Sequence, residues 1–307
     1  MRWGVLGASS RIHRQRLRPA FALAGQRIVA EASRRGDDLS AYEELLADDG
    51  VDAVYVPLPN ALHVPWITRA LECGKHVLCE KPLTMSGAET ESVFAAAADA
   101  GRHLSEAYMW PHHPRSRRLV ELVSAGDLGT LISHHAAFTF VLDRPTDHRF
   151  DERGGGALLD VGIYCLGPAL FVGEVAEPGE VVARARRSET GVDVSMSGSV
   201  VLAGDATASF VVSYEAPARR QQVLTGTGGL VVIDNHVPGP ERPGSFSVLR
   251  PDGSREEVGH AGANAYERMV TAFAAEAAGE VEPRWGAPAA VRLAHLIDAL
   301  HAASASS

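Results

Sequence analysis

The first 110 residues alternate short apolar runs with segments of helical periodicity, and this alternation constrains the fold more than any other feature of the chain. Strands that are separated by helices require right-handed crossovers and therefore a parallel sheet. We expect a doubly wound α/β domain over residues 1–110. Its predicted strands are 3–6, 27–32, 51–56, 76–79 and 102–105. Its predicted helices are 12–24 with a break at Pro19, 40–48 behind a capping box of Ser40 and Glu43, 61–73, and 86–100.

The remaining residues, 111–307, carry runs of strands with few helices between them. Such runs predict a largely antiparallel open sheet, with one face covered by a helix at 157–171. The fold class is therefore α/β plus α+β, with a second domain over 111–307. Predicted strands are 130–142, 180–188, 192–203, 206–216, 220–227, 229–234 and 246–250, and further helices are 114–126, 264–278 and 287–303.

Composition excludes several classes of function. A net charge of −9 and a pI of about 5.8 argue against a protein that binds nucleic-acid backbones. No apolar run approaches the ~18 residues of a membrane span, and no leader is recognisable, so we expect a cytoplasmic protein with no membrane partner. The three cysteines lack metal-type spacing, and adjacent histidines do not share a face, so no metal site is expected.

The first strand runs into Gly7-Ala8-Ser9-Ser10. A complete dinucleotide fingerprint would read G-x-G-x-x-G/A, but the register here gives Gly7, Ser9 and Ile12, so only the first position matches. Two interpretations stand: a phosphate-binding loop, or a plain strand-to-helix turn. The hydroxyl and N–H groups of Ser9 and Ser10 precede a helix N-terminus, where the helix dipole favours an anion.

The second strand ends in Ala32-Ser33-Arg34-Arg35 and has no acid at the position that usually binds the ribose 2′-hydroxyl of NAD. A hydroxyl followed by arginines suits a 2′-phosphate, because guanidinium binds phosphate in a bidentate way. The alternative is a pair of solvent-facing arginines. We predict NADP, with NAD less favoured.

Two further patterns place polar groups near strand ends or on one helix face. Glu80, Lys81 and Pro82 follow a buried run directly, which indicates either a solvated loop or a ligand site, because open α/β sheets bind ligands at strand carboxyl ends. Asp160 and Tyr164 are four residues apart on one predicted helix, after three glycines that allow close backbone approach.

Four segments together resemble a known family: GVLGAS near the start, YVPLPNALH at 55–63, GKHVLCEKPL at 74–83 and GGGALLDVGIY at 154–164. They are similar, in this order, to the Gfo/Idh/MocA oxidoreductases. The chain most resembles the branch with glucose-fructose oxidoreductase, dimeric dihydrodiol dehydrogenase and xylose dehydrogenases. The resemblance runs from about residue 2 to residue 175, and more loosely beyond.

The resemblance implies an NADP-dependent dehydrogenase or reductase with an N-terminal Rossmann domain. Its substrate would be a sugar, anhydro-sugar or dihydrodiol that exchanges a hydride with nicotinamide. Lys81 and Tyr164 would form the proton-transfer pair. A lysine cation lowers the pKa of tyrosine from about 10 by favouring phenolate, so that Tyr164 can take the alcohol proton. Asp160 would bind a substrate hydroxyl or hold Lys81, and Glu80 would support the loop, in which the peptide after Lys81 is often cis.

The expected cofactor-binding residues are Gly7, Ala8, Ser9, Ser10, Ile12, Ser33, Arg34, Pro57, Leu58, Asn60, His63, Glu80 and Lys81. The expected substrate-binding residues are Lys81, Arg149, Asp160 and Tyr164. The alternatives are a surface lysine at 81, a solvent-facing Asp160, a core-packing Tyr164 and an ordinary helix-start histidine at 63.

An open sheet needs a second cover, and the family provides it with another subunit, so a homodimer through the C-terminal sheet is expected. Residues 33–50 depart from the family, because 18 residues leave room for one helix where relatives fit a helix, a strand and a second helix. Weaker cofactor binding would follow. A nicotinamide-nucleotide-binding protein with little catalysis, such as a sensor or a partner subunit, is therefore the alternative function.

Overall fold

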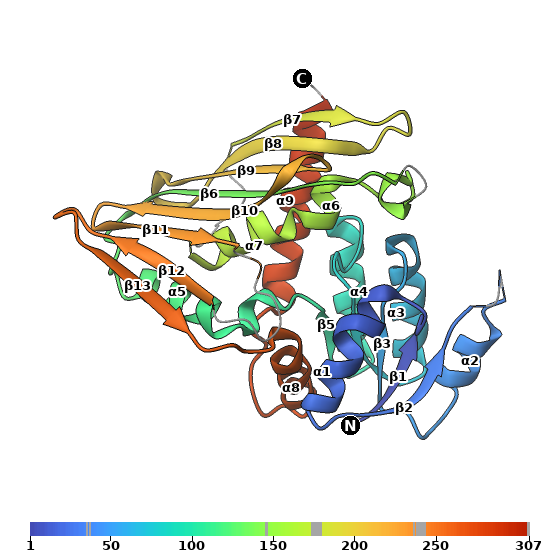
Figure 1. Cartoon of the computed structure of the whole chain (residues 1–307). Helices are drawn as coiled ribbons and strands as arrows, with labels where there is room; N and C mark the ends of the chain where they lie inside the picture. The colour runs from blue at the N-terminus through green and yellow to red at the C-terminus, as the bar shows by residue number, and fades with distance from the viewer. Residues whose placement is uncertain are drawn as a thin grey trace. The chain divides into compact units, whose positions relative to one another are not determined.

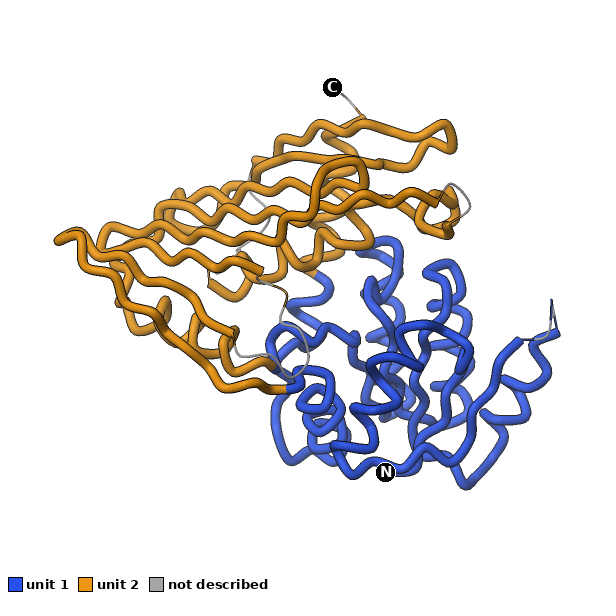
Figure 2. The backbone as a smooth tube through the Cα atoms, viewed as in Figure 1, with its two compact units in different colours: residues 1–112, 264–291 blue, residues 113–263, 292–307 orange. Residues whose placement is uncertain are grey.

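The computed structural model describes residues 1–34, 36, 38–144, 147–172, 180–235, 237 and 244–305. They form two compact units: residues 1–112 with 264–291, and residues 113–263 with 292–307 (Figure 2). Residues 264–291 thus belong to the first unit, although the sequence analysis assigned them to the second domain. The reason is packing of α8 (Ala265–Ala277), in which the Phe273 ring lies 4.9 Å from the Trp3 ring of the first strand.

The first unit contains the predicted doubly wound sheet (Figure 1). In the described residues its strands pair in parallel in the order β2-β1-β3-β4-β5. The chain leaves β1 toward β2 on one side and returns to β3 on the other, so the switch point lies between β1 and β3. The strands are β1 Arg2–Leu6, β2 Arg27–Ala32, β3 Ala53–Val56, β4 His76–Cys79 and β5 Leu104–Glu106. The helices before α8 are α1 Arg18–Leu23, α2 Ser40–Leu46, α3 His63–Glu72 and α4 Gly87–Asp99, with short turns η1 His13–Leu17, η2 Asn60–Leu62 and η3 Trp110–His112.

The helix after β1 is interrupted as expected. The π-helical turn η1 precedes α1, and Pro19 lies in the first turn of α1. Proline has no N–H to donate to the carbonyl four residues earlier, so a regular α-helical ladder cannot continue through this point.

The predicted capping box at Ser40 is wrong. Ser40 is the first residue of α2, Leu39 is its N-cap, and no side chain caps the helix. Asp38 Oδ1 instead accepts the Ser40 N–H at 2.9 Å. Between Ala32 and Ser40 the described residues contain no further helix or extended strand, as the short 33–50 segment predicts.

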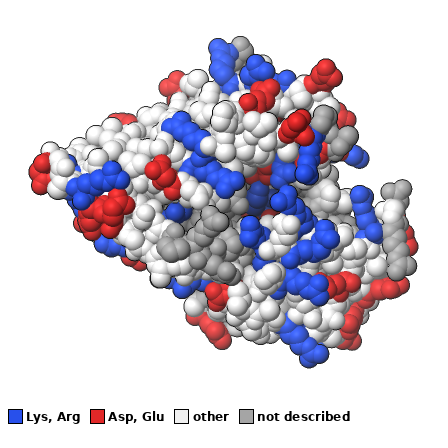
Figure 3. Space-filling view, viewed as in Figure 1, with Lys and Arg blue, Asp and Glu red and all other residues white. Residues whose placement is uncertain are grey.

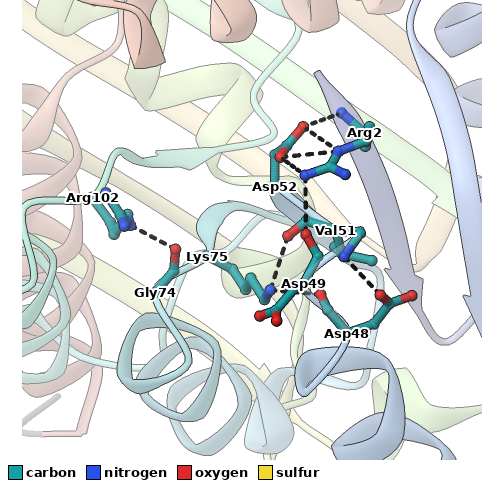
Figure 4. Close-up of polar contacts among 9 residues, drawn as sticks. Arg2, Asp48, Asp49, Val51, Asp52, Gly74, Lys75 and Arg102 are labelled. Carbon is teal, nitrogen blue, oxygen red and sulfur yellow. Dashed lines mark hydrogen bonds and ion pairs between the residues drawn. The ribbon is translucent and has the colours of Figure 1, made fainter.

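Polar contacts tie together the segments that lead into β1, β3 and β4 (Figure 4). Lys75 is almost completely buried, and its Nζ donates to the carbonyl oxygens of Asp48 at 2.8 Å and Val51 at 2.9 Å. Beside it, an Arg2 guanidinium N–H donates to Asp52 at 2.7 Å. These bonds fix the amino ends of the strands, at the opposite edge of the sheet from the strand carboxyl ends.

The second unit contains one large, mostly antiparallel sheet. In the described residues its strand order is β13-β12-β11-β10-β6-β9-β8-β7, and only β6 and β9 pair in parallel. The strands are β6 Leu131–Val141, β7 Val181–Arg187, β8 Asp193–Val201, β9 Thr207–Ser213, β10 Glu215–Gly226, β11 Gly229–Asp234, β12 Gly244–Leu249 and β13 Arg255–His260. The prediction missed β13, because its exposed Arg255-Glu256-Glu257 shows no apolar alternation.

Helices α6 and α7 lie against β6, β8 and β9 (Figure 1). The predicted single helix at 157–171 is in fact these two, α6 Ala157–Val161 and α7 Ile163–Val172, with Gly162 between them. Asp160 and Tyr164 therefore belong to consecutive helices. The other elements are α5 Pro114–Ser124, α9 Ala287–Ala305, η4 His148–Phe150 and η5 Ala203–Asp205. No described helix is long and apolar enough to cross a membrane.

Candidate functional site

The loop after β1 passes very close to the loop after β3, at the switch point of the first sheet. Gly7 has a φ of +101°, a region that side chains other than glycine rarely adopt. A Cβ at this position would lie 2.8 Å from Leu58 Cδ2 and 3.2 Å from the Pro57 carbonyl oxygen. The structure thus brings Gly7, Pro57 and Leu58 together, and only glycine fits at the crossing.

The same loop is tied to the end of β2. The Gly7 and Ala8 N–H groups donate to the Ala32 carbonyl at 2.8 and 2.9 Å, and the Ser9 N–H donates to Ser33 Oγ at 3.0 Å. Those three N–H groups are therefore occupied within the protein. The next helix begins at Arg11, and its first N–H groups have no carbonyl partner in their own helix. The Arg11 and Ile12 amides thus lie at the start of this helix, a position where backbone N–H groups can bind an anion.

Exposed arginines follow this loop along the chain, although the chain is acidic overall. Figure 3 shows Lys and Arg atoms gathered over α1 on the visible face. Arg34, after β2, is exposed, and its N–H donates to the Tyr42 hydroxyl at 3.2 Å. The end of β2 therefore fits a 2′-phosphate with Ser33 and Arg34, whereas Arg35 lies outside the described residues. The exposed arginines around α1 are Arg11, Arg14, Arg16 and Arg18.

The segment after β3 contains Asn60 and His63, which the sequence analysis assigned to the cofactor. Asn60 begins η2 and is partly exposed. His63 begins α3, and its side chain is completely buried. Both ring nitrogens face backbone carbonyls, with Nε2 2.8 Å from the Leu58 oxygen and Nδ1 2.9 Å from the Pro82 oxygen. The ring of His63 is thus directed at the protein backbone.

The loop after β4 carries Glu80, Lys81 and Pro82, and the Lys81–Pro82 peptide bond is cis. Glu80 is buried, and its Oε1 accepts the Tyr55 hydroxyl at 2.6 Å. Burial and then the Glu80 charge raise the pKa of Tyr55, so this hydroxyl stays protonated and donates. Glu80 Oε2 also accepts the Lys81 N–H at 3.2 Å, which agrees with a supporting role for Glu80 in this loop.

Glu106, at the end of β5, is a residue that the sequence analysis did not select. Its Oε1 accepts the Leu83 N–H at 2.8 Å and its Oε2 accepts the Trp285 Nε1–H at 2.6 Å. Burial raises the pKa of Glu106. Trp285 lies far away in the sequence, so no local pattern could predict this contact; the only available signal was an acid at a predicted strand end.

The chain has two lysines, Lys75 and Lys81, among its 29 lysine and arginine residues. The structure accounts for Lys75, which is buried and bonds two carbonyls near the amino ends of the strands. Lys81 lies near the carboxyl ends and is partly exposed. It is thus the one lysine at the edge of the sheet where open α/β folds bind ligands.

In the second unit the Asp160 carboxylate is held from two sides. Arg149 Nε donates to Asp160 Oδ2 at 2.6 Å, and the Tyr214 hydroxyl lies 3.2 Å from the same oxygen. The same hydroxyl lies 2.9 Å from the Gly156 carbonyl oxygen, so its single proton is shared between the two acceptors. Burial and then the Asp160 charge raise the pKa of Tyr214, which therefore remains a donor. Asp160 does not lie on an open solvent face, and Tyr214 is a second residue that sequence reasoning missed.

The triple glycine segment before α6 is fixed by Asp193. Gly156 has a φ of +111°, and a Cβ there would collide with the Asp193 carboxylate. Asp193 Oδ2 accepts the Leu158 N–H at 2.8 Å, in the first turn of α6.

Tyr164, on α7, is mostly buried, and its ring centroid lies 5.6 Å from that of Phe138. In the described residues, no group of three His, Cys, Asp or Glu side chains could hold a metal ion.

Comparisons with known proteins agree with this geometry. Residues 1–108 match the family model of the Gfo/Idh/MocA oxidoreductases with an NAD-binding Rossmann fold, and residues 116–232 match the model of the Gfo/Idh/MocA C-terminal domain. Both resemblances were expected from the four sequence segments.

Curated relatives include sugar dehydrogenases and reductases. The chain is 36% identical to D-xylose 1-dehydrogenase (NADP(+)) 2 of Haloferax volcanii, over 91% of the chain and 88% of that enzyme. It is 32% identical to dTDP-3,4-didehydro-2,6-dideoxy-α-D-glucose 3-reductase of Actinomadura kijaniata, over 98% of the chain and 94% of that enzyme.

A solved 3-ketoreductase from Actinomadura kijaniata, in complex with NADP and TDP-benzene, superposes with a TM-score of 0.87 at 32% identity. The superposition covers 99% of the chain and 97% of that protein. The NADP predicted from the end of β2 is thus the cofactor named for two of these relatives.

Proposed function

Because the chain belongs to the Gfo/Idh/MocA oxidoreductases, we propose that it transfers a hydride between NADP and a hydroxyl or carbonyl carbon of a sugar-like substrate. The substrate class is a sugar, anhydro-sugar or dihydrodiol. Relatives that act on D-xylose and on a dTDP-linked deoxysugar support this class. The nicotinamide, when bound, gives or takes the hydride. The observation that carries the proposal is the loop after β4, which contains Lys81 and is held by the contacts of Glu80 with Tyr55 and of Leu83 with Glu106.

Lys81 and Tyr164 serve the proton transfer. A lysine ammonium can release a proton, whereas arginine stays protonated in proteins. In a chain whose basic side chains are arginines except for Lys75 and Lys81, a lysine lies at this strand end, which supports a role that needs an exchangeable proton. Tyr164 takes the alcohol proton as the hydride leaves carbon, or donates it in reverse, and the ammonium favours the phenolate form.

Asp160 positions the substrate. Its contacts with Arg149 and Tyr214 hold the carboxylate in one orientation, and both partners donate to it, which favours the ionised form. An ionised carboxylate accepts hydrogen bonds from sugar hydroxyls. Arg149, partly exposed beside it, shapes the rim of this half of the site.

The nucleotide side uses the residues assembled at the switch point. The Arg11 and Ile12 amides would receive the pyrophosphate, and Ser33 with Arg34 would receive the 2′-phosphate. The short connection from β2 to α2 leaves Ser33 and Arg34 in place, and Tyr42 of α2 supports the Arg34 backbone. The chain also retains Lys81 and Tyr164, which a nucleotide-binding protein without catalysis would not need, and for this reason we favour the enzyme.

The assembly proposed is a homodimer through the large sheet, in a cytoplasmic protein. Side chains on β9 and on residues 221–224 of β10 alternate between buried and partly exposed, and α6 and α7 lie against one face of this sheet. The partly exposed side chains include His135, Ser209, Val211, Gln221 and Val223. They are small, apolar or uncharged, which suits a second copy. Light scattering that gives the mass of a single chain at micromolar concentration would exclude this assembly.

The first test is a fluorescence titration with NADPH and NADH, repeated on Arg34→Ala. Arg27→Ala, at the opposite end of β2, is the matched control. We expect NADPH to bind more tightly than NADH, and Arg34→Ala to remove about 1.5–3 kcal/mol of that preference, the usual worth of a hydrogen bond to a charged group. Failure to bind either nucleotide would refute the cofactor assignment.

The second test concerns the proton-transfer pair, with a panel of aldoses and diols as substrates. Lys81→Arg keeps the charge but cannot release a proton, and Lys81→Met removes both. We expect both variants and Tyr164→Phe to lower kcat by about 10²-fold or more, the usual worth of general acid–base catalysis. A Lys81→Arg enzyme with wild-type kcat would show that only the charge matters. NADPH binding without turnover of any substrate would favour the non-catalytic alternative.

A further inference from the structure

The ring of His63 joins two loops of the candidate site. Nε2 faces the Leu58 carbonyl in the loop that leaves β3. Nδ1 lies 2.9 Å from the Pro82 oxygen and 3.2 Å from the Leu83 oxygen, in the loop that leaves β4. Because β3 and β4 are neighbours in the sheet, one buried side chain bridges two adjacent strand ends.

The location of the single proton on this ring follows from the same contacts. A neutral imidazole has one N–H, and the other nitrogen is an acceptor. Nδ1 faces two carbonyl oxygens and Nε2 faces one, so a proton on Nδ1 relieves more repulsion between lone pairs. Burial lowers the pKa of His63, and the three carbonyl contacts oppose this effect without reversing it. The lowered pKa favours the neutral ring. The Nδ1–H therefore donates to the Pro82–Leu83 segment.

That segment directly follows Lys81 and has other anchors on both sides. Before Lys81, Tyr55 holds the Glu80 carboxylate. After it, Glu106 accepts the Leu83 N–H. His63 supplies a further anchor, on the carbonyl side of the same residues. Since none of these contacts involves the Lys81 side chain, the anchors determine where its backbone lies and from where its ammonium extends.

We propose that His63 is a positioning residue that holds the loop after β4 through its Nδ1–H and thereby places Lys81 for proton transfer. The inference rests on the role proposed for Lys81. In this role His63 supports the loop and does not contact the cofactor, because its ring is completely buried and faces three carbonyl oxygens. A misplacement of about 1 Å costs roughly 10²-fold in rate, so partial release of the loop should cost about tenfold.

Two substitutions separate the two ends of the ring. The amide nitrogen of asparagine lies near the Nδ1 position of histidine, and that of glutamine lies near Nε2. His63→Asn therefore keeps a donor for Pro82 and Leu83, and His63→Gln keeps one for Leu58. His76→Gln, at the start of β4, is the control, because His76 Nδ1 accepts the His103 N–H far from Lys81 along the strand.

We expect His63→Gln to lower kcat by about tenfold or more with an NADPH Kd within about threefold of wild type, and His63→Asn to keep kcat within about threefold. Equal losses in the two variants, a larger loss in His63→Asn, or an unchanged His63→Gln would overturn the inference. If His63→Gln does not fold, His63→Asn decides alone, since a loss of about tenfold in that variant contradicts a role through Nδ1.

Hydrogen exchange gives a readout that does not depend on turnover. The peptide that contains the Lys81 and Leu83 amides should exchange faster in His63→Gln than in wild type, and at the wild-type rate in His63→Asn. If wild type binds NADPH but turns over no substrate, the proposed function fails, while the exchange rates still decide whether His63 holds this loop. Unchanged exchange in His63→Gln would exclude it.

Discussion

Replacing Gly7 by alanine should damage the crossing of the β1 and β3 loops through two separable effects. The first is conformational, because a φ of +101° is costly for any residue with a side chain, by about 1–3 kcal/mol. The second is crowding, because the new Cβ would lie 2.8 Å from Leu58 Cδ2 and 3.2 Å from a backbone oxygen of Pro57. Overpacking of this kind costs about 1–3 kcal/mol.

We therefore expect Gly7→Ala to lower the free energy of unfolding by about 2–6 kcal/mol, or to shift the loop and weaken NADPH binding by a corresponding amount. Gly25→Ala is the matched control: its φ is +66°, but a Cβ there meets nothing within 4 Å. It should lose only the conformational part, about 1–2 kcal/mol. Leu58→Ala in the Gly7→Ala background should restore the part of the stability that is lost to crowding, but not the part that is lost to backbone strain.

Urea unfolding followed by circular dichroism, together with NADPH titration, measures both outcomes. A Gly7→Ala protein that loses no more stability than Gly25→Ala and keeps its NADPH affinity would refute the reasoning. It would mean that the loops after β1 and β3 do not cross closely. Full recovery in the double variant would show that crowding against Leu58 is the whole effect.

Three further predictions concern polar contacts elsewhere in the two units. The side-chain hydrogen bond from Arg2 lowers the pKa of Asp52 to about 2. An acid with a lowered pKa stabilises the fold at any pH above the pKa that it has in the unfolded chain, and this stabilisation is lost as the pH falls toward 2. Because the pair is exposed, Asp52→Asn should cost about 1 kcal/mol or less near pH 7 and nothing at pH 2, and thermal melts with a pH-independent difference would contradict this. Tyr214→Phe should destabilise by about 1–3 kcal/mol and raise KM for substrate more than it lowers NADPH affinity, measured by melts and steady-state kinetics; an unchanged KM would separate Tyr214 from Asp160. Lys75→Met removes the donor for two buried carbonyls and should cost about 2–4 kcal/mol in urea unfolding with the NADPH Kd unchanged, whereas a stable variant would show that water replaces the ammonium.

The local patterns of the chain determined the first sheet and the polar residues at its strand ends. Alternating strands and helices allow few topologies, so β1 to β5 and the ends at Gly7, Ser33 and Glu80 were predictable from periodicity and composition. The same periodicity failed at β13, whose charged residues show no alternation, and at Ser40, where Asp38 instead of the serine side chain meets the helix start.

Only the tertiary structure decided which groups support the site, because its contacts join residues that are distant in the sequence. Glu106 meets Trp285, and Asp160 meets Tyr214, through bonds that no local period encodes. His63 illustrates the division best: the sequence placed a histidine at a helix start after β3, and burial against three carbonyls turned its ring toward the backbone beside Lys81. Short-range periodicity fixes elements, whereas desolvation and hydrogen bonding across the fold fix what each polar side chain can do.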